Sequence, residues 1–393
     1  MSEVPLSDLE AAMRRRVQVL PPRIRPSTTE RGELPRAFVL SGARGVGKTT
    51  FLLHHALAAG VLHVSVDNPL LAGIALYELG RAAFMAGYRG VAFDEVHFAK
   101  DWGAHLKALY DDFPDRAVWA SDSSSLALRG GVADLSRRFV PVHMPLMSFR
   151  EFLFLESGAV LPTIDPFSGG TGGSLPRVDA ALLQAFRRYR EGGTRPFQGE
   201  GDFRERMLAV LEKSLYADVP FLLPKVGESN LRLMNAIVAT LARSAVPRLQ
   251  VRSLCADWNV GADRLYALIE VMEAIGLLRV VRYENDTKAR SVGAKLFFAD
   301  PAFYGVLGGN AGTMREALVA ALCAESGWLV EASREETTGD FVISRLGGSS
   351  TRRIALEVGG ASKRRKGSDF VIRDDLDYPT AAALPLWMLG MMY

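Results

Sequence analysis

The residues best suited to chemistry form a glycine-rich stretch over residues 41–50, SGARGVGKTT. Its spacing matches the P-loop pattern, in which bent backbone turns N–H groups toward the phosphates of a nucleotide. Lys48 would place its charge on the outer phosphates, and the Thr49 hydroxyl would bind Mg²⁺. The predicted ATP-binding residues are Gly42, Gly45, Val46, Gly47, Lys48, Thr49 and Thr50.

A pair of carboxylates ends the apolar run GVAFDEVH at residues 90–97. Asp94 is expected to hold the Mg²⁺ together with Thr49, and Glu95 to polarise the attacking water. Glu95 and Lys48 are therefore predicted catalytic residues. The alternative is a strand end with two solvated acids.

The elements that must position these residues are visible around them. The strand-like run AFVL precedes the loop, and a predicted helix over about 48–59 aims its positive end at the phosphates. A strand over 62–66 and a helix over about 71–86 come next. Asp94 therefore falls on the third strand, which predicts another strand between the P-loop strand and the metal strand.

Two later segments carry candidates for sensing and activation. The predicted fourth strand, residues 116–126, ends in serines, and Ser123 is the first choice for a γ-phosphate sensor, with Ser121 next. A serine-rich turn is the alternative. Arg137 and Arg138 open the segment 137–144, RRFVPVHM, which predicts a fifth strand. They are either a solvated pair or an arginine finger toward a neighbouring subunit.

The chain as a whole has an ordinary composition. Its 393 residues are too many for a single hydrophobic core, so two or three domains are expected. A net charge of +3 implies no global attraction to DNA or membranes. Two distant cysteines fit a reducing cytoplasm rather than a disulfide framework or a zinc cluster. No apolar run reaches the roughly 18 residues of a membrane span, and no signal peptide is recognisable.

The middle of the chain predicts a winged helix. A Gly/Pro-rich interval in 157–200 reads as a long loop, and three helical segments and two strand-like runs follow between 229 and 300. Arg264 lies near the start of the candidate recognition helix, and Lys288, Arg290 and Lys295 lie in or beside the wing. The module could read DNA, or it could only pack subunits or sense the nucleotide.

The last region has the layout of a restriction-endonuclease-like metal site. A helix carries Glu316, one strand holds Asp340 and another holds Glu357. The lysine that such sites place two residues after the glutamate is replaced by Gly359, and Lys363 begins a basic run that could contact phosphates. We therefore expect a nuclease fold with an incomplete second metal site, serving as a scaffold or DNA clamp rather than cutting.

Five segments together resemble the archaeal and bacterial AAA-like P-loop ATPases that carry a C-terminal domain of unknown function. They are FVLSGARGVGKTT, VSVDNPLL, GVAFDEVHFAKDWGAHLKALYDDFPD, ASDSSSL and MPLMSFREFL. The family's sensor usually reads Gly-Ser-Ser, where this chain has Asp122-Ser123-Ser124. Its finger reads Ser-Gly-Arg, which aligns with Ser136-Arg137-Arg138 and makes Arg138 the candidate finger. The resemblance also implies a nuclease-like terminal domain.

The expected fold is α/β, with an AAA-like P-loop NTPase parallel sheet, a winged-helix middle and a restriction-endonuclease-like α/β C-terminal domain. The expected divisions are residues 1–150 for the ATPase core, 151–228 for a helical lid and linker, 229–308 for the winged helix and 309–393 for the nuclease-like domain.

The expected function is Mg²⁺-dependent ATP hydrolysis that drives remodelling or translocation of nucleic acid, with DNA as partner. The cofactors are ATP and Mg²⁺, and the chain would form a homo-oligomer such as a hexamer in the cytoplasm, without a membrane. The alternatives are an ATP-dependent switch that regulates a protein partner, and an ATP-dependent nuclease.

Overall fold

The computed structural model describes residues 4–122, 135–168, 175–222, 227–245, 251–284, 286, 295–334, 338–347, 350–365 and 367–393. The chain forms two compact units, Met1–Pro145 and Leu146–Tyr393. The finer division of the second unit into three domains stays a prediction.

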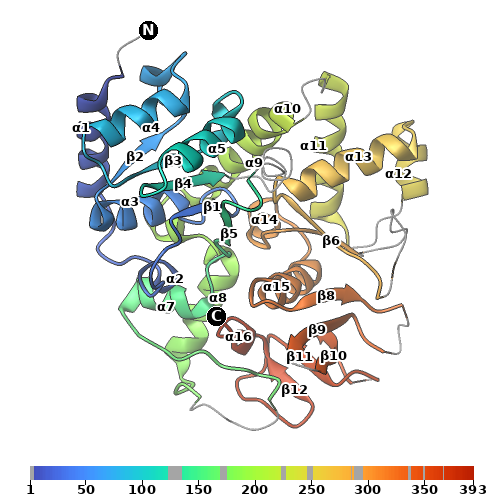
Figure 1. Cartoon of the computed structure of the whole chain (residues 1–393). Coiled ribbons are helices and arrows are strands. Elements are labelled where there is room, and N and C mark those ends of the chain that lie inside the picture. Colours follow the sequence, from blue (N-terminus) through green and yellow to red (C-terminus); the bar gives the residue numbers. More distant parts are fainter. Residues whose placement is uncertain are drawn as a thin grey trace. The chain divides into compact units, whose positions relative to one another are not determined.

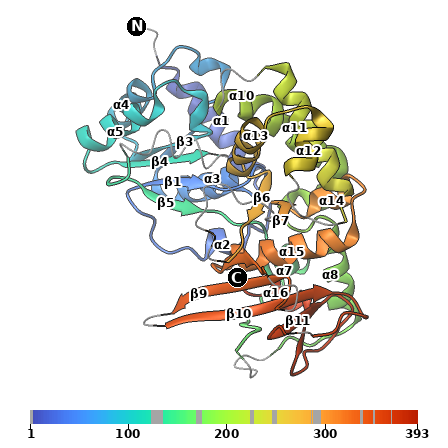
Figure 2. The same ribbon diagram turned by 90° about the vertical axis from the view of Figure 1, so that its right-hand side faces the viewer.

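A five-stranded sheet organises the first unit. The strands are β1 (Ala37–Ser41), β2 (Val61–Ser65), β3 (Gly90–Asp94), β4 (Ala117–Asp122) and β5 (Val140–His143). Their order is β2-β3-β4-β1-β5, and all neighbours are parallel. Figure 2 shows β3, β4, β1 and β5 side by side in this order. Because β4 lies between β1 and β3, the predicted intervening strand is confirmed. The inner strands are buried on both faces, as parallel strands covered by helices must be.

Helices pack against this sheet in two groups (Figure 1). α1 (Leu6–Gln18) and α3 (Lys48–Ala59) contact each other and β2, while α4 (Leu76–Met85) and α5 (Trp102–Asp112) contact each other and the β3–β4 region. Three short helical segments complete the unit: α2 (Pro26–Thr29), η1 (Pro69–Leu71) and η2 (Val96–Phe98).

The second unit begins with helices. They are α7 (Phe149–Ser157), α8 (Ala180–Gly192), η3 (Pro196–Glu200), α9 (Phe203–Lys213), the π-helical η4 (Ser214–Asp218) and α10 (Val219–Leu222). The expectation of a loop through residues 157–200 is wrong from Ala180 on. Leu182, Phe186 and Tyr189 recur at helical spacing and are buried on one face of α8, which outweighs the Gly/Pro-rich composition before it.

The candidate winged helix has the predicted order of elements. α11 (Glu228–Arg243), α12 (Val251–Trp258) and α13 (Ala262–Ala274) precede β6 (Leu278–Val281) and β7 (Lys295–Phe298). The two strands form an antiparallel pair in which Leu278 lies opposite Phe298. Lys288 and Arg290 lie outside the described residues.

A mixed sheet forms the end of the second unit. After α14 (Ala302–Val306) and α15 (Ala311–Glu325) come β8 (Leu329–Ala332), β9 (Phe341–Gly347), β10 (Ser350–Gly359), β11 (Phe370–Arg373), β12 (Ala383–Pro385) and α16 (Leu386–Leu389). The order is β12-β11-β10-β9-β8, antiparallel from β8 to β10 and parallel from β10 to β12. Among the described residues, no helix has both the length and the apolarity needed to cross a membrane.

Candidate nucleotide-binding site

The loop between β1 and α3 has a backbone that only glycines suit. Gly45 and Gly47 have φ angles of 83° and 108°, in the region that residues with a Cβ avoid. A Cβ on Gly42 would come within 2.5 Å of the carbonyl oxygen of Met144. The buried Arg25 anchors the loop from behind, because its guanidinium donates to the carbonyl oxygen of Val46 at 2.9 Å. The glycines therefore set the loop's shape before any ligand binds.

Lys48 opens α3 and is 5% exposed. Its ammonium donates to the carbonyl oxygens of Gly42 at 2.8 Å and Ala43 at 3.3 Å. Burial lowers the pKa of Lys48, and the negative charges of Glu95 and Asp94 oppose this shift. The ammonium thus lies against the loop, where phosphate oxygens could take over from the carbonyl acceptors.

Asp94 ends β3 beside Thr49, and the two together suit a magnesium ion. Thr49 donates its hydroxyl to Asp94 Oδ2 at 2.7 Å, Ser121 donates to Oδ1, and His63 Nε2 lies 3.5 Å from Oδ2. Burial alone would raise the pKa of Asp94. The hydrogen bonds and the imidazole outweigh it and hold the pKa well below its usual value. A charged carboxylate next to a threonine hydroxyl is the donor set that Mg²⁺ takes in P-loop proteins.

Glu95 is held in an uncommon backbone conformation next to Asp94. Its φ of 58° lies in the left-handed region, which non-glycine residues enter mainly where function or packing requires it. Ser121 Oγ accepts the Glu95 N–H at 3.2 Å. The carboxylate lies 3.7 Å from Arg44 Nη1 and 3.5 Å from His97 Nδ1. These contacts place the carboxylate beside Arg44 of the P-loop.

The strand order explains why these groups meet. β4 lies beside both β1 and β3, so Ser121 and Asp122 at its end reach the residues that follow β3. His97 Nδ1 is 3.3 Å from Asp122 Oδ1, and Ser121 contacts Asp94. The first-choice sensor, Ser123, lies outside the described residues, so the second choice, Ser121, is the serine that the structure places at the site.

The structure thus brings together Lys48, Thr49, Asp94 and Glu95. Sequence reasoning missed His63 and Arg44. Arg44 could have been suspected because it lies inside the P-loop, whereas a single histidine within a strand carries no such signal.

Arg138 contacts another element of its own unit. Its guanidinium forms a two-pronged ion pair with Asp111 on α5, with Nε–Oδ1 and Nη2–Oδ2 distances of 2.8 and 2.9 Å. Arg137 is exposed. An arginine finger at Arg138 would have to release Asp111, so that role stays a prediction.

A lysine just beyond the turn that follows β10 lies beside the candidate second metal site. In the second unit, Lys363 Nζ lies 2.9 Å from Glu357, and the Lys363 side chain runs through the space that a Cβ at Gly359 would need. A lysine thus lies beside Glu357 although the sequence places Gly359 two residues after it, and the metal site itself stays a prediction. The chain turns at Gly359-Gly360, and the Lys363 side chain then lies in the space that a side chain on Gly359 would occupy.

Comparison with known proteins agrees with the geometry of the first sheet. Residues 34–153 match the family model of an AAA domain. The matched residues contain the P-loop, Asp94 and Glu95, and an AAA domain implies ATP binding and hydrolysis, so residues 34–153 form an AAA-type ATPase domain. No curated protein matches the chain.

The solved structures that are similar to the chain include the following three. The Walker-type ATPase PABY2304 of Pyrococcus abyssi has a TM-score of 0.38 and 15% identity, over 78% of this chain and 96% of that one. A single-substitution variant of Thermotoga maritima RuvB has a TM-score of 0.30 and 17% identity, over 70% of this chain and 89% of that one. The Saccharomyces cerevisiae Hsp104–ADP complex has a TM-score of 0.29 and 18% identity, over 68% of this chain and 38% of that one.

Ser121→Ala should lower ATP turnover by about tenfold, because one serine hydroxyl holds both Asp94 and the Glu95 backbone in the AAA domain. The Mg²⁺ concentration that gives half-maximal turnover should rise as Asp94 loosens. Steady-state ATPase assays across a magnesium titration would measure both. An unchanged magnesium requirement would contradict this role for Ser121.

Proposed function

We propose that this AAA-type ATPase uses ATP hydrolysis to remodel or translocate nucleic acid. The arrangement that carries the hydrolytic part is the cluster of Lys48, Thr49, Asp94 and Glu95. Lys48 would hold the outer phosphates, while Thr49 and Asp94 would hold Mg²⁺, which supplies charge neutralisation for phosphoryl transfer when bound. Glu95 would orient the attacking water and accept its proton.

The nucleic-acid part of the proposal is supported by the second unit. The order α11, α12, α13, β6, β7 is that of a winged helix, which places its second and third helices against DNA in many proteins. The mixed sheet that follows holds Asp340 just before β9 and Glu357 on the neighbouring β10, which is compatible with the expected nuclease-like domain. Two modules of this kind would engage the sugar-phosphate backbone.

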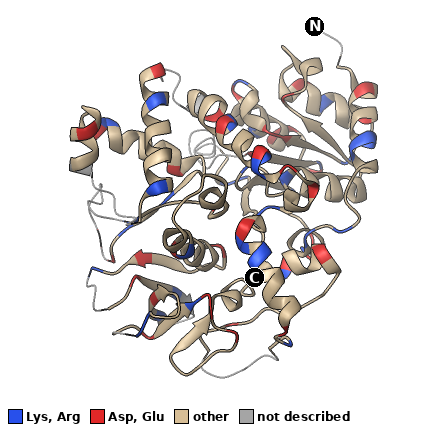
Figure 3. Cartoon of the chain, turned by 180° about the vertical axis from the view of Figure 1, so that it is seen from behind, with Lys and Arg blue, Asp and Glu red and all other residues tan. Residues whose placement is uncertain are grey.

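A specific observation favours the second candidate, a switch that regulates a protein partner. Arg264, the basic residue near the start of α13, is hydrogen-bonded to Asn230 and Ser229 of α11 at 2.6 and 2.8 Å. In Figure 3 basic and acidic positions are interspersed along the helices. A helix that reads DNA normally presents its basic side chains to the phosphates.

The deciding experiment is the ATPase rate with single-stranded, duplex and branched DNA. Stimulation by any of them supports nucleic-acid work, and an indifferent rate together with stimulation by a protein partner supports the switch. The mass in solution with nucleotide would test the proposed homo-oligomer, in which Arg138 would leave Asp111 to reach a neighbour's nucleotide.

Lys48→Met should weaken Mg·ATP binding by about 10- to 100-fold, because a charge-assisted hydrogen bond to phosphate contributes roughly 1.5–3 kcal/mol. It should abolish DNA-dependent movement along with turnover. Calorimetry with Mg·ATP would measure the affinity. If the variant binds Mg·ATP as tightly as the wild type, Lys48 does not contact the phosphates.

A further inference from the structure

The first unit has a cavity of about 580 Å³ between the segments that follow β2 and β3. One wall is formed by residues of 66–76, which include η1, and the other by residues 98–101 together with His105 of α5. In the described part of the chain, neither wall includes the P-loop, Asp94 or Glu95. Cavities of this size are typical of sites that take a small molecule or a few side chains of a partner.

Both walls of the cavity are hydrogen-bonded to the two acids of the ATP site. The Val66 N–H donates to the carbonyl oxygen of Asp94 at 2.9 Å. The Phe98 N–H donates to the carbonyl oxygen of Glu95 at 3.2 Å. The Phe98 ring also lies against the His97 ring, with centroids 4.3 Å apart, and His97 Nδ1 is 3.5 Å from the Glu95 carboxylate. A ligand that displaced either wall would therefore move groups that hold Asp94 or Glu95.

The lining of the cavity is more apolar than polar, and its charges are mainly negative. Leu71 is buried in one wall, and Phe98, which is 46% exposed, adds an aromatic ring to the other. The charged lining residues are Asp67, Lys100 and Asp101, so two carboxylates accompany one ammonium. Such a lining repels phosphate groups, whereas an apolar side chain next to a positive charge matches both its surface and its charge.

We propose that this cavity binds a segment of a partner polypeptide in which an apolar side chain lies next to a lysine or arginine, and that its occupancy is coupled to the nucleotide at the P-loop. The apolar side chain would pack against Leu71 and Phe98, and the basic one would pair with Asp67 or Asp101. The hydrogen bonds of Val66 and Phe98 would carry the coupling. The inference deepens the second candidate function, because it rests on a protein partner and names the chemistry of that partner and its site.

The first test titrates labelled heptapeptides against the full chain without nucleotide and follows fluorescence anisotropy. Each peptide contains one leucine beside an arginine, a serine or a glutamate. The arginine peptide should bind at least about tenfold more tightly than the glutamate peptide. The double variant Asp67→Asn with Asp101→Asn should abolish this preference. Asp115→Asn, which removes an exposed carboxylate of the same unit outside the cavity, should leave the preference unchanged.

The outcomes separate a polypeptide site from a nucleic-acid site and from a failure of the ATPase. Phe98→Ala should weaken binding of the arginine peptide at least about fivefold and leave the binding of a labelled single-stranded oligonucleotide unchanged. No peptide binding, equal binding of the three peptides, or loss of oligonucleotide binding in Phe98→Ala would overturn the proposal. These measurements need no hydrolysis, so they do not depend on whether the proposed ATPase function holds.

A second test measures the coupling on the wild-type chain with a non-hydrolysable ATP analogue, adenylyl imidodiphosphate, and Mg²⁺. The affinity for the arginine peptide should change at least about fivefold when the analogue is bound, because coupling between two sites commonly amounts to about 5- to 150-fold. The peptide should change the affinity for the analogue by the same factor, since such coupling is reciprocal. Equal peptide affinities with and without the analogue would overturn the coupling.

Discussion

Glu95→Gln is expected to bind Mg·ATP as the wild type does and to turn it over about 10²- to 10⁴-fold more slowly. Glutamine keeps the size of the side chain and its contact with His97, but it cannot accept a proton from water. The Glu95 backbone should stay in place, because its N–H is bound by Ser121 whatever the side chain carries. Binding and turnover would therefore separate in this variant.

Calorimetry for binding and a steady-state phosphate-release assay for turnover would test this separation. Glu78→Gln is the matched control, because Glu78 on the surface of α4 makes an exposed ion pair with Arg81 away from the loop. Its turnover should equal that of the wild type. If Glu95→Gln hydrolyses ATP at the wild-type rate, another group orients the water.

Asp300→Ala is expected to lower the free energy of unfolding of the second unit by about 3–5 kcal/mol. Asp300 is fully buried and accepts hydrogen bonds from Arg195 Nε at 2.5 Å, Thr194 Oγ1 at 2.8 Å and the Ala302 N–H at 2.9 Å. Removing it breaks the ion pair between Asp300 and Arg195, which is 1% exposed. Breaking a buried ion pair by removing one partner is among the most destabilising single changes.

Urea unfolding followed by circular dichroism would measure the loss, which corresponds to roughly 10 °C in the melting temperature of a unit of this size. Arg232→Met is the control, since Arg232 and Glu228 form an ion pair on α11 with both side chains more than three-quarters exposed. That pair should contribute less than about 1 kcal/mol. If both variants lowered the free energy of unfolding by similar amounts, burial would not explain the stabilisation by the Asp300–Arg195 pair.

Sequence reasoning succeeded where the chemistry is local. The P-loop is a contiguous stretch whose glycines determine their own backbone, and Asp94-Glu95 ends an unbroken apolar strand, so motif and element support each other. The same segments correctly predicted the helix after the loop and the presence of a strand between β1 and β3.

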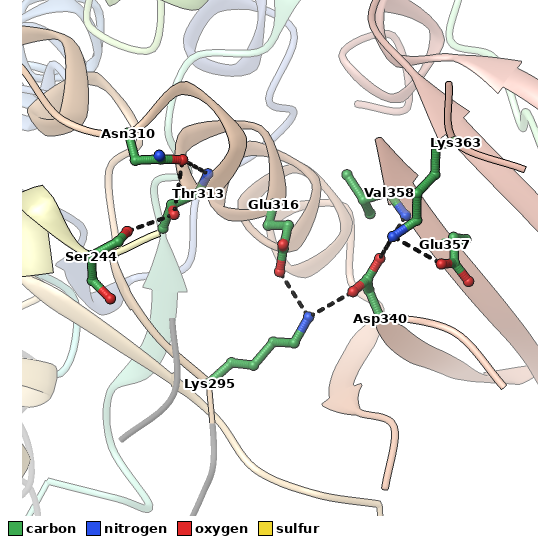
Figure 4. Close-up of polar contacts among 9 residues, drawn as sticks. All are labelled: Ser244, Lys295, Asn310, Thr313, Glu316, Asp340, Glu357, Val358 and Lys363. Carbon is green, nitrogen blue, oxygen red and sulfur yellow. Dashed lines mark hydrogen bonds and ion pairs between the residues drawn. The ribbon is translucent and has the colours of Figure 1, made fainter. Parts of the chain in front are cut away.

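The parts that could not be predicted depend on distant segments meeting. His63 reaches Asp94 only because β2 lies next to β3, and nothing in the sequence VLHVS indicates that its histidine faces a carboxylate. Lys363 fills the place of Gly359 only because the chain turns back on itself. Lys295, predicted in or beside the wing, reaches Glu316 on α15 and Asp340 just before β9 through tertiary packing (Figure 4).

The two units differ in when they can form during synthesis. The first unit is one continuous stretch, so all its partners have left the ribosome soon after Pro145. The second closes around its last residues: Arg150 donates to the carbonyl oxygen of Tyr393, and the Ile164 N–H donates to that of Met391. The ATP site could therefore form before the second unit, which still requires translation of well over half the chain. The nascent protein could then bind nucleotide before its second unit has folded.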